Sequence, residues 1–244
     1  MKNGLFITGT GTDVGKTIVT AGILRHLRRR GLDIVSMKPV QTGGVPGPDG
    51  LIAPDLEVHL KAADLAISAE QRALMSPYVY EPACSPHLAG RLAGNYPSID
   101  HCCACARKLG EQHQGVLIEG AGGLLVPLDE EETLLSLIIQ LEMPALIVAH
   151  IGLGTVNHCL LTIDALREAE VPIAGVIFNT VSPDVGGDFI AWDNPDAVSR
   201  FGGVELLGNV PWLGDLENDP NAAWAKFEAS VHGLAAMASY FAVS

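Results

Sequence analysis

One glycine-rich segment near the start of the chain, FITGTGTDVGKTIV at residues 6–19, constrains the fold most strongly. An apolar run at residues 5–8 leads into it, and apolar side chains recur at helical spacing over residues 16–30, before Gly31. A strand, a glycine turn and a helix in this order present the backbone N–H groups of the helix N-terminus to an anion. The segment therefore predicts a strand, loop and helix unit that binds phosphate.

The loop departs by one residue from the standard phosphate-binding pattern. G-x-x-x-x-G-K-[ST], closed here by residues 15–17, would open with a glycine at position 10, where the chain has Thr10 with a glycine on either side. Those glycines still allow φ > 0 and close approach of the backbone to a ligand. We expect Lys16 to contact the outer phosphates and Thr17 to offer its hydroxyl to Mg²⁺. The alternative, an ordinary glycine-rich turn, is disfavoured by the strand before it and the helix after it.

Length and composition favour one compact α/β domain. The chain has 244 residues, 48% of them hydrophobic, with a mean hydropathy of +0.28, enough to bury a sizeable core. No apolar run approaches the ~18 to 20 residues of a membrane span, and the first strand begins too early to leave room for a signal peptide. We therefore expect a cytoplasmic protein without a membrane partner. The formal charge of −13 argues against nucleic acid, since binding to its backbone depends on clustered Lys and Arg.

Short apolar strands alternate with helical stretches, which is typical of a doubly wound, mostly parallel sheet flanked by helices. The expected strands are residues 5–8, 34–38, 115–119, 145–149, 173–179 and 204–209. The expected helices after the first are residues 54–64, 86–93, 98–113, 133–141, 156–170, 194–201 and 222–241. No internal repeat or linker divides the chain, so residues 1–244 are expected to form a single domain of the P-loop NTPase type.

Three of the five cysteines lie together beside a histidine: Cys102, Cys103 and Cys105 follow His101. Metal sites usually separate their ligands as C-x₂₋₄-C with a second pair further on, and adjacent residues point in different directions on a helix. A helix N-cap is expected at Ser98. The pattern favours buried or half-buried thiols on a helix over a metal site.

Polar residues at the predicted strand ends form the candidate site, because ligands of such sheets bind at the carboxyl ends of the strands. Glu119 ends one strand before the glycines of residues 120–123, where a carboxylate commonly holds Mg²⁺; the alternative is a solvated acid. Lys38 ends the second strand, although taken alone it is better explained as a surface charge. Asp55 is either a first-turn partner of the helix dipole or a metal ligand. The loop at residues 43–50 is expected to be flexible and near this site.

Eight segments in their order and approximate spacing resemble the dethiobiotin synthetases, the ATP-dependent ligases of biotin biosynthesis. The resemblance covers residues 4 to about 214. The segments are TGTGTDVGKT, KPVQTG, PDLEVHL, SPHLAGRLA, VLIEGAGGLLVPL, GLGTVNHCLLT, GVIFNTV and LGNVPWL. The long phosphate loop, unusual against the standard pattern, looks like this family's own form of it.

The resemblance implies an ATP site, a Mg²⁺ site and two catalytic lysines. The implied ATP-binding residues are Asp13, Val14, Gly15, Lys16, Thr17, Glu119, Gly120, Ala121, Gly122, Asn179, Pro211, Trp212 and Leu213. Of these, Asn179 and residues 211–213 would contact adenine. The implied metal ligands are Thr17, Asp55 and Glu119, and the implied catalytic residues are Lys16 and Lys38.

The resemblance also implies a site for 7,8-diaminononanoate. The implied substrate-binding residues are Lys38, Thr42, Gly154, Thr155, Val156 and Asn157. Lys38 and Thr42 would face the diamine and its carbamate, and residues 154–157 would receive the tail carboxylate across the interface of a homodimer. This chain lacks the lysine that some members place just before the Leu-Gly of that segment, so Asn157 and backbone amides would bind the tail. Asp13 replaces the Glu of some members, and residues 81–87 hold one residue more than in some relatives.

The implied reaction needs cations in the active site more than it needs a general acid and a general base. One amine takes up CO₂, supplied as bicarbonate, to form a carbamate; the carbamate attacks the γ-phosphate to give a carbamic-phosphoric anhydride; and the second amine closes the ureido ring, so that ADP and phosphate are released. Each step creates or moves negative charge, which Lys16, Lys38 and Mg²⁺ would offset.

Two other classes share this nucleotide core. A P-loop ATPase switch of the partitioning or septum-positioning type would carry a further lysine early in the loop, and its membrane-bound form a basic amphipathic helix at the end of the chain. This chain has Thr10 and Gly11 in the loop, and its last helical segment is not basic. An ATP-dependent amidoligase would need a glutaminase domain with a nucleophilic cysteine, for which 244 residues leave no room.

Overall fold

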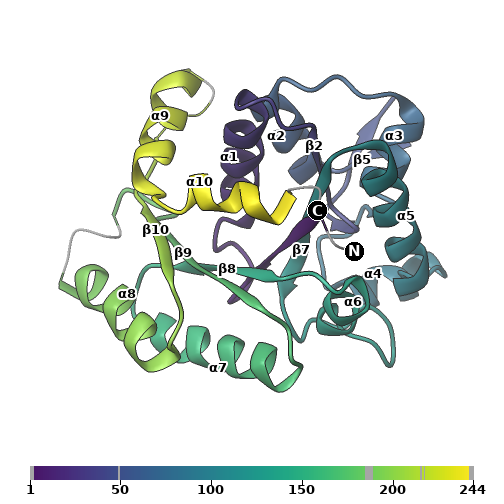
Figure 1. Cartoon of the computed structure of the whole chain (residues 1–244). Helices are drawn as coiled ribbons and strands as arrows, with labels where there is room; N and C mark the ends of the chain where they lie inside the picture. The colour runs from purple at the N-terminus through teal and green to yellow at the C-terminus, as the bar shows by residue number, and fades with distance from the viewer. Residues whose placement is uncertain (1–2, 49, 185–188, 215, 217, 242–244) are drawn as a thin grey trace.

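Six parallel strands form the central sheet of the protein (Figure 1). The structure is a computed structural model, and it describes residues 3–48, 50–184, 189–214, 216 and 218–241. The strand order is β10-β9-β8-β1-β7-β2, and every neighbouring pair is parallel. The strands are β1 (Gly4–Gly9), β2 (Ile34–Met37), β7 (Gly115–Gly123), β8 (Ala145–His150), β9 (Ile173–Asn179) and β10 (Leu206–Val210). The predicted doubly wound sheet is confirmed.

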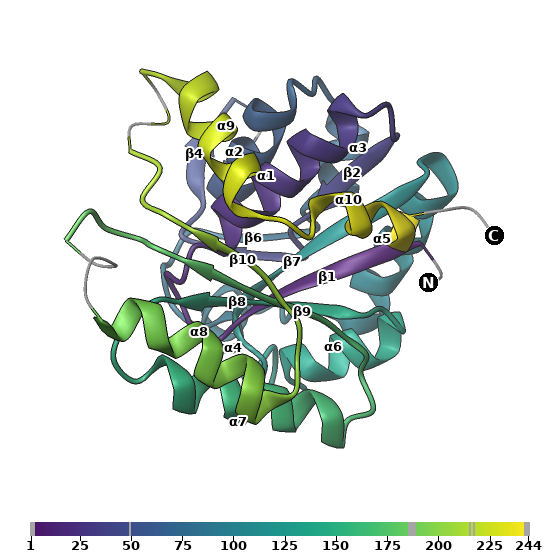
Figure 2. The same cartoon turned by 60° about the vertical axis from the view of Figure 1, so that its left-hand side comes forward.

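Helices cover both faces of the sheet (Figure 2). One face packs against α1 (Lys16–Arg29), α9 (Pro220–Ser230) and α10 (Leu234–Met237), and the other against α5 (Ile99–Gln112), α6 (Leu134–Leu141), α7 (Thr155–Glu168) and α8 (Phe189–Gly202). Strand β1 contributes side chains to the apolar cores on both faces of the sheet. Phe6 belongs to one core, and Leu5 and Ile7 belong to the other. Successive side chains of a strand point to opposite faces, so a strand buried on both sides has a continuous apolar sequence.

Two small sheets and three helices extend the carboxyl edge between β2 and α5. Strand β3 (Val40–Thr42) pairs in parallel with β6 (Tyr78–Tyr80), and β4 (Val45–Gly47) pairs antiparallel with β5 (Gly50–Ile52). The helices are α2 (Pro54–Ala63), α3 (Ala69–Met75) and α4 (Pro86–Ala93). In the segment expected as a loop at residues 43–50, residues 45–47 and 50 belong instead to the paired strands β4 and β5, and residue 49 lies outside the described residues. Three-residue strands with Pro and Gly carry too little alternation to be predicted from sequence.

Other element boundaries also differ from the sequence-based expectation. Helix α8 includes residues before the expected start at 194, because Pro195 lies inside the helix rather than at its first turn. The single helical segment expected at 222–241 is divided into α9, α10 and the short 3₁₀ helix η1 (Ala238–Phe241). The break falls at Val231, which pairs with Gly208 beside β10. In the described part of the chain, no helix combines the length and the apolar character needed to cross a membrane.

The cysteine cluster is part of the core. Cys102, Cys103 and Cys105 lie on α5 with exposures of 4% or less, and the side chain of Ser98 caps this helix by accepting the His101 N–H. Burial raises the pKa of Cys102 to about 12. Among the described residues, no group of three His, Cys, Asp or Glu side chains is arranged to hold a metal ion. The prediction of buried helix thiols is confirmed.

Candidate active site

The glycine-rich loop between β1 and α1 has the backbone geometry of an anion-binding turn. Gly15 caps α1 with φ +94°, and a Cβ at this position would lie 2.0 Å from the Asn179 amide nitrogen. Asp13 also has positive φ, at +58°. Asn179, at the end of β9, donates a hydrogen bond to the Val14 carbonyl at 3.2 Å. Glycine is therefore required at residue 15, and the loop is held to the end of β9, which lies two strands away from β1.

A cavity of about 1250 Å³ opens at the carboxyl edge of the sheet and gathers most of the predicted residues. Those that line it are Asp13, Gly15, Lys16, Thr17, Lys38, Thr42, Asp55, Glu119, Ala121, Gly122, Asn179, Trp212 and Leu213. Val14, Gly120 and Pro211 are not among its described lining residues, although each adjoins one in sequence. The loop, β7, the start of α2 and the segment after β10 thus face one space.

The predicted tail-binding residues, Gly154, Thr155, Val156 and Asn157, lie elsewhere. Gly154 caps α7 with φ +91°, Asn157 is exposed, and neither belongs to the described lining of the cavity. The neighbouring Leu153 is 91% exposed. The segment is a helix N-terminus on the surface, and its role in substrate binding remains a prediction.

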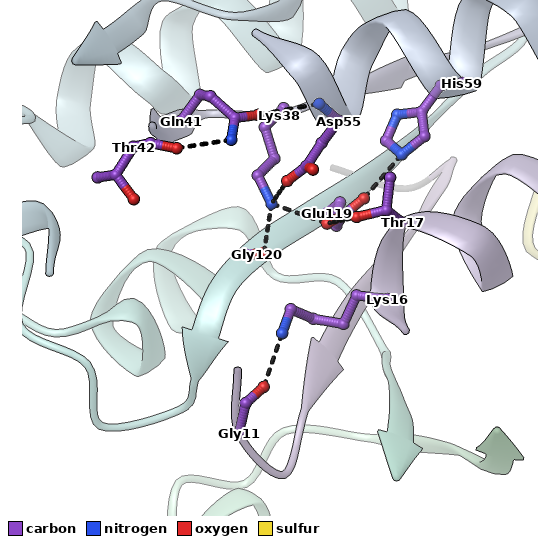
Figure 3. Close-up of polar contacts among 10 residues, drawn as sticks. All are labelled: Gly11, Lys16, Thr17, Lys38, Gln41, Thr42, Asp55, His59, Glu119 and Gly120. Atoms are coloured by element: carbon purple, nitrogen blue, oxygen red, sulfur yellow. Dashed lines mark hydrogen bonds and ion pairs between the residues drawn. The ribbon is translucent and has the colours of Figure 1, made fainter. Parts of the chain in front are cut away.

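Lys38 joins the two predicted metal-binding carboxylates (Figure 3). Its Nζ lies 2.7 Å from Asp55 Oδ2 and 2.7 Å from Glu119 Oε1, and it donates to the Gly120 carbonyl at 3.1 Å. Lys38 is 3% exposed, so the interpretation of this residue as a surface charge is wrong. The reason is topological: β2 lies beside β7, and the residue after its last strand position faces the carboxylate of Glu119.

The pKa values of this pair favour the charged forms. Burial alone would lower the pKa of Lys38, but Glu119 and then Asp55 raise it above its ordinary value. Burial alone would raise the pKa of Glu119, but the Lys38 ammonium and a hydrogen bond from His59 hold it well below its usual range. The cluster therefore keeps one ammonium and at least one carboxylate ionised beside the cavity, although the Lys38 and Glu119 side chains are 4% and 1% exposed.

Thr17 and Lys16 extend this cluster toward the loop. The Thr17 hydroxyl donates to Glu119 Oε1 at 3.1 Å, and Lys16 Nζ donates to the Gly11 carbonyl at 2.8 Å. Burial, with the nearby positive charge of Lys38, lowers the pKa of Lys16 to about 8. Lys38 thus destabilises the charge of Lys16, and two lysines beside one cavity form a site suited to a polyanion.

His59 and Gln41 belong to the site but were missed from the sequence. His59 Nε2 lies 2.7 Å from Glu119 Oε2, and Gln41 accepts the Asp55 backbone N–H while it donates to the Thr42 carbonyl. A signal for His59 was present, since residues four apart share one face of a helix and His59 follows Asp55 by four. No sequence signal distinguished Gln41 from an ordinary loop residue.

Solved structures with this fold include two P-loop ATPases. The cell division ATPase MinD of Pyrococcus furiosus has a TM-score of 0.57 and 17% identity, covering 94% of this chain and 99% of that one. A ParA family ATPase of Chlorobium tepidum has a TM-score of 0.53 and 14% identity, covering 97% and 93%. At these identities the likeness shows the fold alone, and it confirms a P-loop NTPase architecture.

Sequence comparisons identify the family. A family model described as an AAA domain matches residues 3–220. The ATP-dependent dethiobiotin synthetase BioD of Anaeromyxobacter sp. (strain K) is 40% identical over 213 residues, covering 87% of this chain and 92% of that protein. The protein of the same name from Chromohalobacter salexigens is 39% identical over 223 residues, covering 89% and 93%. The chain therefore belongs to the family of ATP-dependent dethiobiotin synthetases.

Proposed function

We propose that this protein is a Mg²⁺-dependent cyclo-ligase that forms dethiobiotin from 7,8-diaminononanoate, CO₂ and ATP through a carbamate and a carbamic-phosphoric anhydride. The observation that carries the proposal is the position of Lys38, a buried ammonium that opens onto the same cavity as the phosphate-binding loop. The name of these relatives, ATP-dependent dethiobiotin synthetase, supports ATP as a substrate and dethiobiotin as the product. The geometry supports a place where a phosphoryl group and an acidic substrate group would meet.

The residues at the carboxyl edge fit a magnesium ion. Thr17, Asp55 and Glu119 offer a hydroxyl and two carboxylates, and all three are hard oxygen donors of the kind Mg²⁺ prefers. The carboxylates already converge on one cation, because both lie 2.7 Å from the Lys38 ammonium. Bound Mg²⁺ would offset the charge of the phosphate oxygens during transfer.

The nucleotide would lie across the loop. The N-terminus of α1 and Lys16 would hold the phosphates, since unpaired N–H groups and the helix dipole favour anions there. Lys16 Nζ donates one hydrogen bond to the Gly11 carbonyl, and its ammonium has two further N–H donors for the phosphates. Asn179 and Trp212, which also line the cavity, would contact the base.

Lys38 would act as an electrostatic group at the reacting centre. Carboxylation forms an N–C bond and releases a proton from the first amine. Phosphoryl transfer then forms a bond between a carbamate oxygen and the γ-phosphorus and breaks the bond between that phosphorus and the ADP oxygen. Ring closure forms the second N–C bond, releases a proton from the second amine and breaks the C–O bond to phosphate. Glu119 and Asp55 raise the pKa of Lys38, which favours its charged form in this site. It would therefore offset the charge of the carbamate and of the transferring phosphoryl group.

The protein would act as a homodimer with the substrate tail at the interface. The exposed helix N-terminus at residues 154–157, beside the 91% exposed Leu153, supports this part of the proposal. Asn157→Ala should raise the KM for the diamine and leave ATP affinity nearly unchanged, because the tail alone would be held there. An equal loss of ATP affinity with an unchanged diamine KM would contradict this assignment.

The deciding experiment measures ADP release that depends on both the diamine and bicarbonate, with the product identified by mass. An ATPase switch would release ADP without the diamine and would overturn the proposal. The route can be tested with ¹⁸O-bicarbonate added immediately before the enzyme. Attack by a carbamate oxygen predicts that one ¹⁸O reaches inorganic phosphate, whereas its absence from phosphate would exclude the mixed anhydride.

A further inference from the structure

Glu119 receives hydrogen bonds on both of its carboxylate oxygens, from two different directions. Oε1 faces the cavity side and accepts from Lys38 at 2.7 Å and from Thr17 at 3.1 Å. Oε2 lies 2.7 Å from His59 Nε2 (Figure 3). Because an ionised carboxylate can only accept, the His59 Nε2 carries the hydrogen. One oxygen therefore contacts the residues that line the cavity, and the other accepts a hydrogen bond from the histidine.

His59 lies behind the carboxylate rather than in the cavity. Its side chain is fully buried, and it is absent from the described lining of the cavity that Glu119 shares with Lys38. Its second ring nitrogen, Nδ1, has no hydrogen-bond partner in the described part of the chain. A buried histidine with a single polar partner has one specific interaction to contribute, the hydrogen bond to Glu119.

That hydrogen bond helps to fix the plane of the Glu119 carboxylate, and with it the direction in which one oxygen faces the cavity. The last side-chain torsion of Glu joins an sp³ carbon to an sp² carbon and has a broad preference, so packing alone orients this carboxylate weakly. His59 also follows Asp55 by one helical turn on α2. The same helix thus places one candidate metal ligand directly and orients the other through the histidine.

We propose that His59 is a positioning residue that holds Glu119 with Oε1 toward the metal and nucleotide, so that α2 sets the geometry of both carboxylates. The inference rests on the proposed function in assigning Glu119 to Mg²⁺. It goes beyond that function because it assigns a role to a residue outside the cavity. Hydrogen-bonding partners that orient metal ligands typically contribute about 10- to 100-fold to metal affinity.

The test compares two amide substitutions that differ in reach. The nitrogen of Gln is as many bonds from Cβ as Nε2 of His and can donate to Oε2, whereas the amide of Asn is one methylene shorter. We expect His59→Asn to lower the Mg²⁺-dependent gain in affinity for a non-hydrolysable ATP analogue by about 10- to 100-fold. His59→Gln should stay within about threefold of the wild type, because the hydrogen bond is restored. The ATP analogue is titrated into each protein in a calorimeter, once with Mg²⁺ and once with EDTA. The ratio of the two affinities is the Mg²⁺-dependent gain.

Thr20→Val provides the control for a buried polar substitution that does not touch Glu119. Thr20 is fully buried on α1, and its hydroxyl has no hydrogen-bond partner in the described structure. This variant should leave the Mg²⁺-dependent gain unchanged.

Three results would overturn the role of His59: equal gains in the Asn and Gln variants, a loss of affinity in EDTA as large as that in Mg²⁺, or a His59→Asn protein that does not fold. Failure of the proposed function would be seen separately, because none of these titrations contains the diamine. A wild type that gains affinity from Mg²⁺ but makes no dethiobiotin would overturn the reaction and leave the role of His59 standing.

Discussion

The neighbouring strands β2 and β7 carry a polar network at each end, and the two networks differ in their surroundings more than in their distances. At the amino ends, Asp33 lies 3.1 Å from Arg28 and 2.9 Å from His113. At the carboxyl ends, Lys38 lies 2.7 Å from Glu119. The Asp33 side chain is 55% exposed, whereas those of Lys38 and Glu119 are 4% and 1% exposed.

The comparison shows that a short contact distance does not indicate how much an ion pair matters. Water screens the exposed network, and such pairs typically contribute about 0 to 1 kcal/mol. A buried charge that loses its partner has no water to replace it, and removal of one partner typically costs about 3 to 5 kcal/mol. The buried network also lies at the carboxyl edge, where the helix N-terminus and the cavity meet.

The largest expected effect comes from removing Glu119. Glu119→Ala would leave the Lys38 ammonium buried with Asp55 as its remaining carboxylate partner, so the free energy of unfolding should fall by about 3 to 5 kcal/mol. Urea denaturation followed by circular dichroism measures this change. A loss below about 1 kcal/mol, the range of exposed pairs, would remove the distinction between the two ends.

Asp55→Ala should affect the metal more than the fold. Asp55 is 28% exposed, and Lys38 would keep Glu119 as its partner, so the cost in stability should be smaller than for Glu119. As a proposed ligand of a metal held by few protein groups, it should raise the Mg²⁺ concentration needed for turnover. If turnover of the variant depends on the Mg²⁺ concentration in the same way as turnover of the wild type, Asp55 is not a metal ligand.

Acid should weaken the buried network in a defined pH window. The pKa of Glu119 lies below its unfolded value, so its stabilising contribution is present above about pH 4.3, the ordinary value for Glu, and is lost as the pH falls toward the folded value. Glu119→Gln should therefore show a shallower loss of stability between pH 5 and pH 3 than the wild type. Equal slopes in urea denaturation across this range would contradict the lowered pKa.

The smallest effect should come from the exposed network. Partial burial opposes ionisation of Asp33, but hydrogen bonds from His113 and Arg28 hold its pKa below its usual range. Asp33→Asn should nevertheless cost no more than about 1 kcal/mol, because solvent screens the lost charge. Thermal melting at low and high salt measures both the cost and the screening. A loss comparable to that of Glu119→Ala would show that the amino-end network is also structurally essential.

The sequence predicts the sheet and the loop well because their signals are local. Residues 5–8 and 16–30 carry the apolar pattern of a strand and a helix on either side of the glycines. The strand ends then follow from the rule that ligands bind at the carboxyl edge of a parallel sheet. Glu119 and Lys38 could therefore be placed at one edge without any knowledge of their contacts.

What sequence could not supply depends on packing between distant segments. Lys38 is buried because β2 pairs with β7 and because Asp55, at the start of α2, lies against its ammonium. The proposed role of His59 further requires α2 to lie close enough to β7 for His59 to hydrogen-bond Glu119. Paired residues of strands β3 and β6 are 38 residues apart in the chain, and both strands are too short to show a period. Segments of this kind are determined by tertiary contacts rather than by local preference.

The central claim, that the carboxyl end of this strand pair is the reacting centre, is tested most directly by the kcat of Lys38→Gln at saturating ATP, diamine and bicarbonate, with Asp33→Asn as the matched control. Loss of a preorganised ammonium at the centre predicts a decrease of about 10² to 10³ in kcat for Lys38→Gln and little change for Asp33→Asn. Thermal melting of both proteins verifies that they are folded. A folded Lys38→Gln protein with kcat within about twofold of the wild type, far short of that loss, would contradict the account.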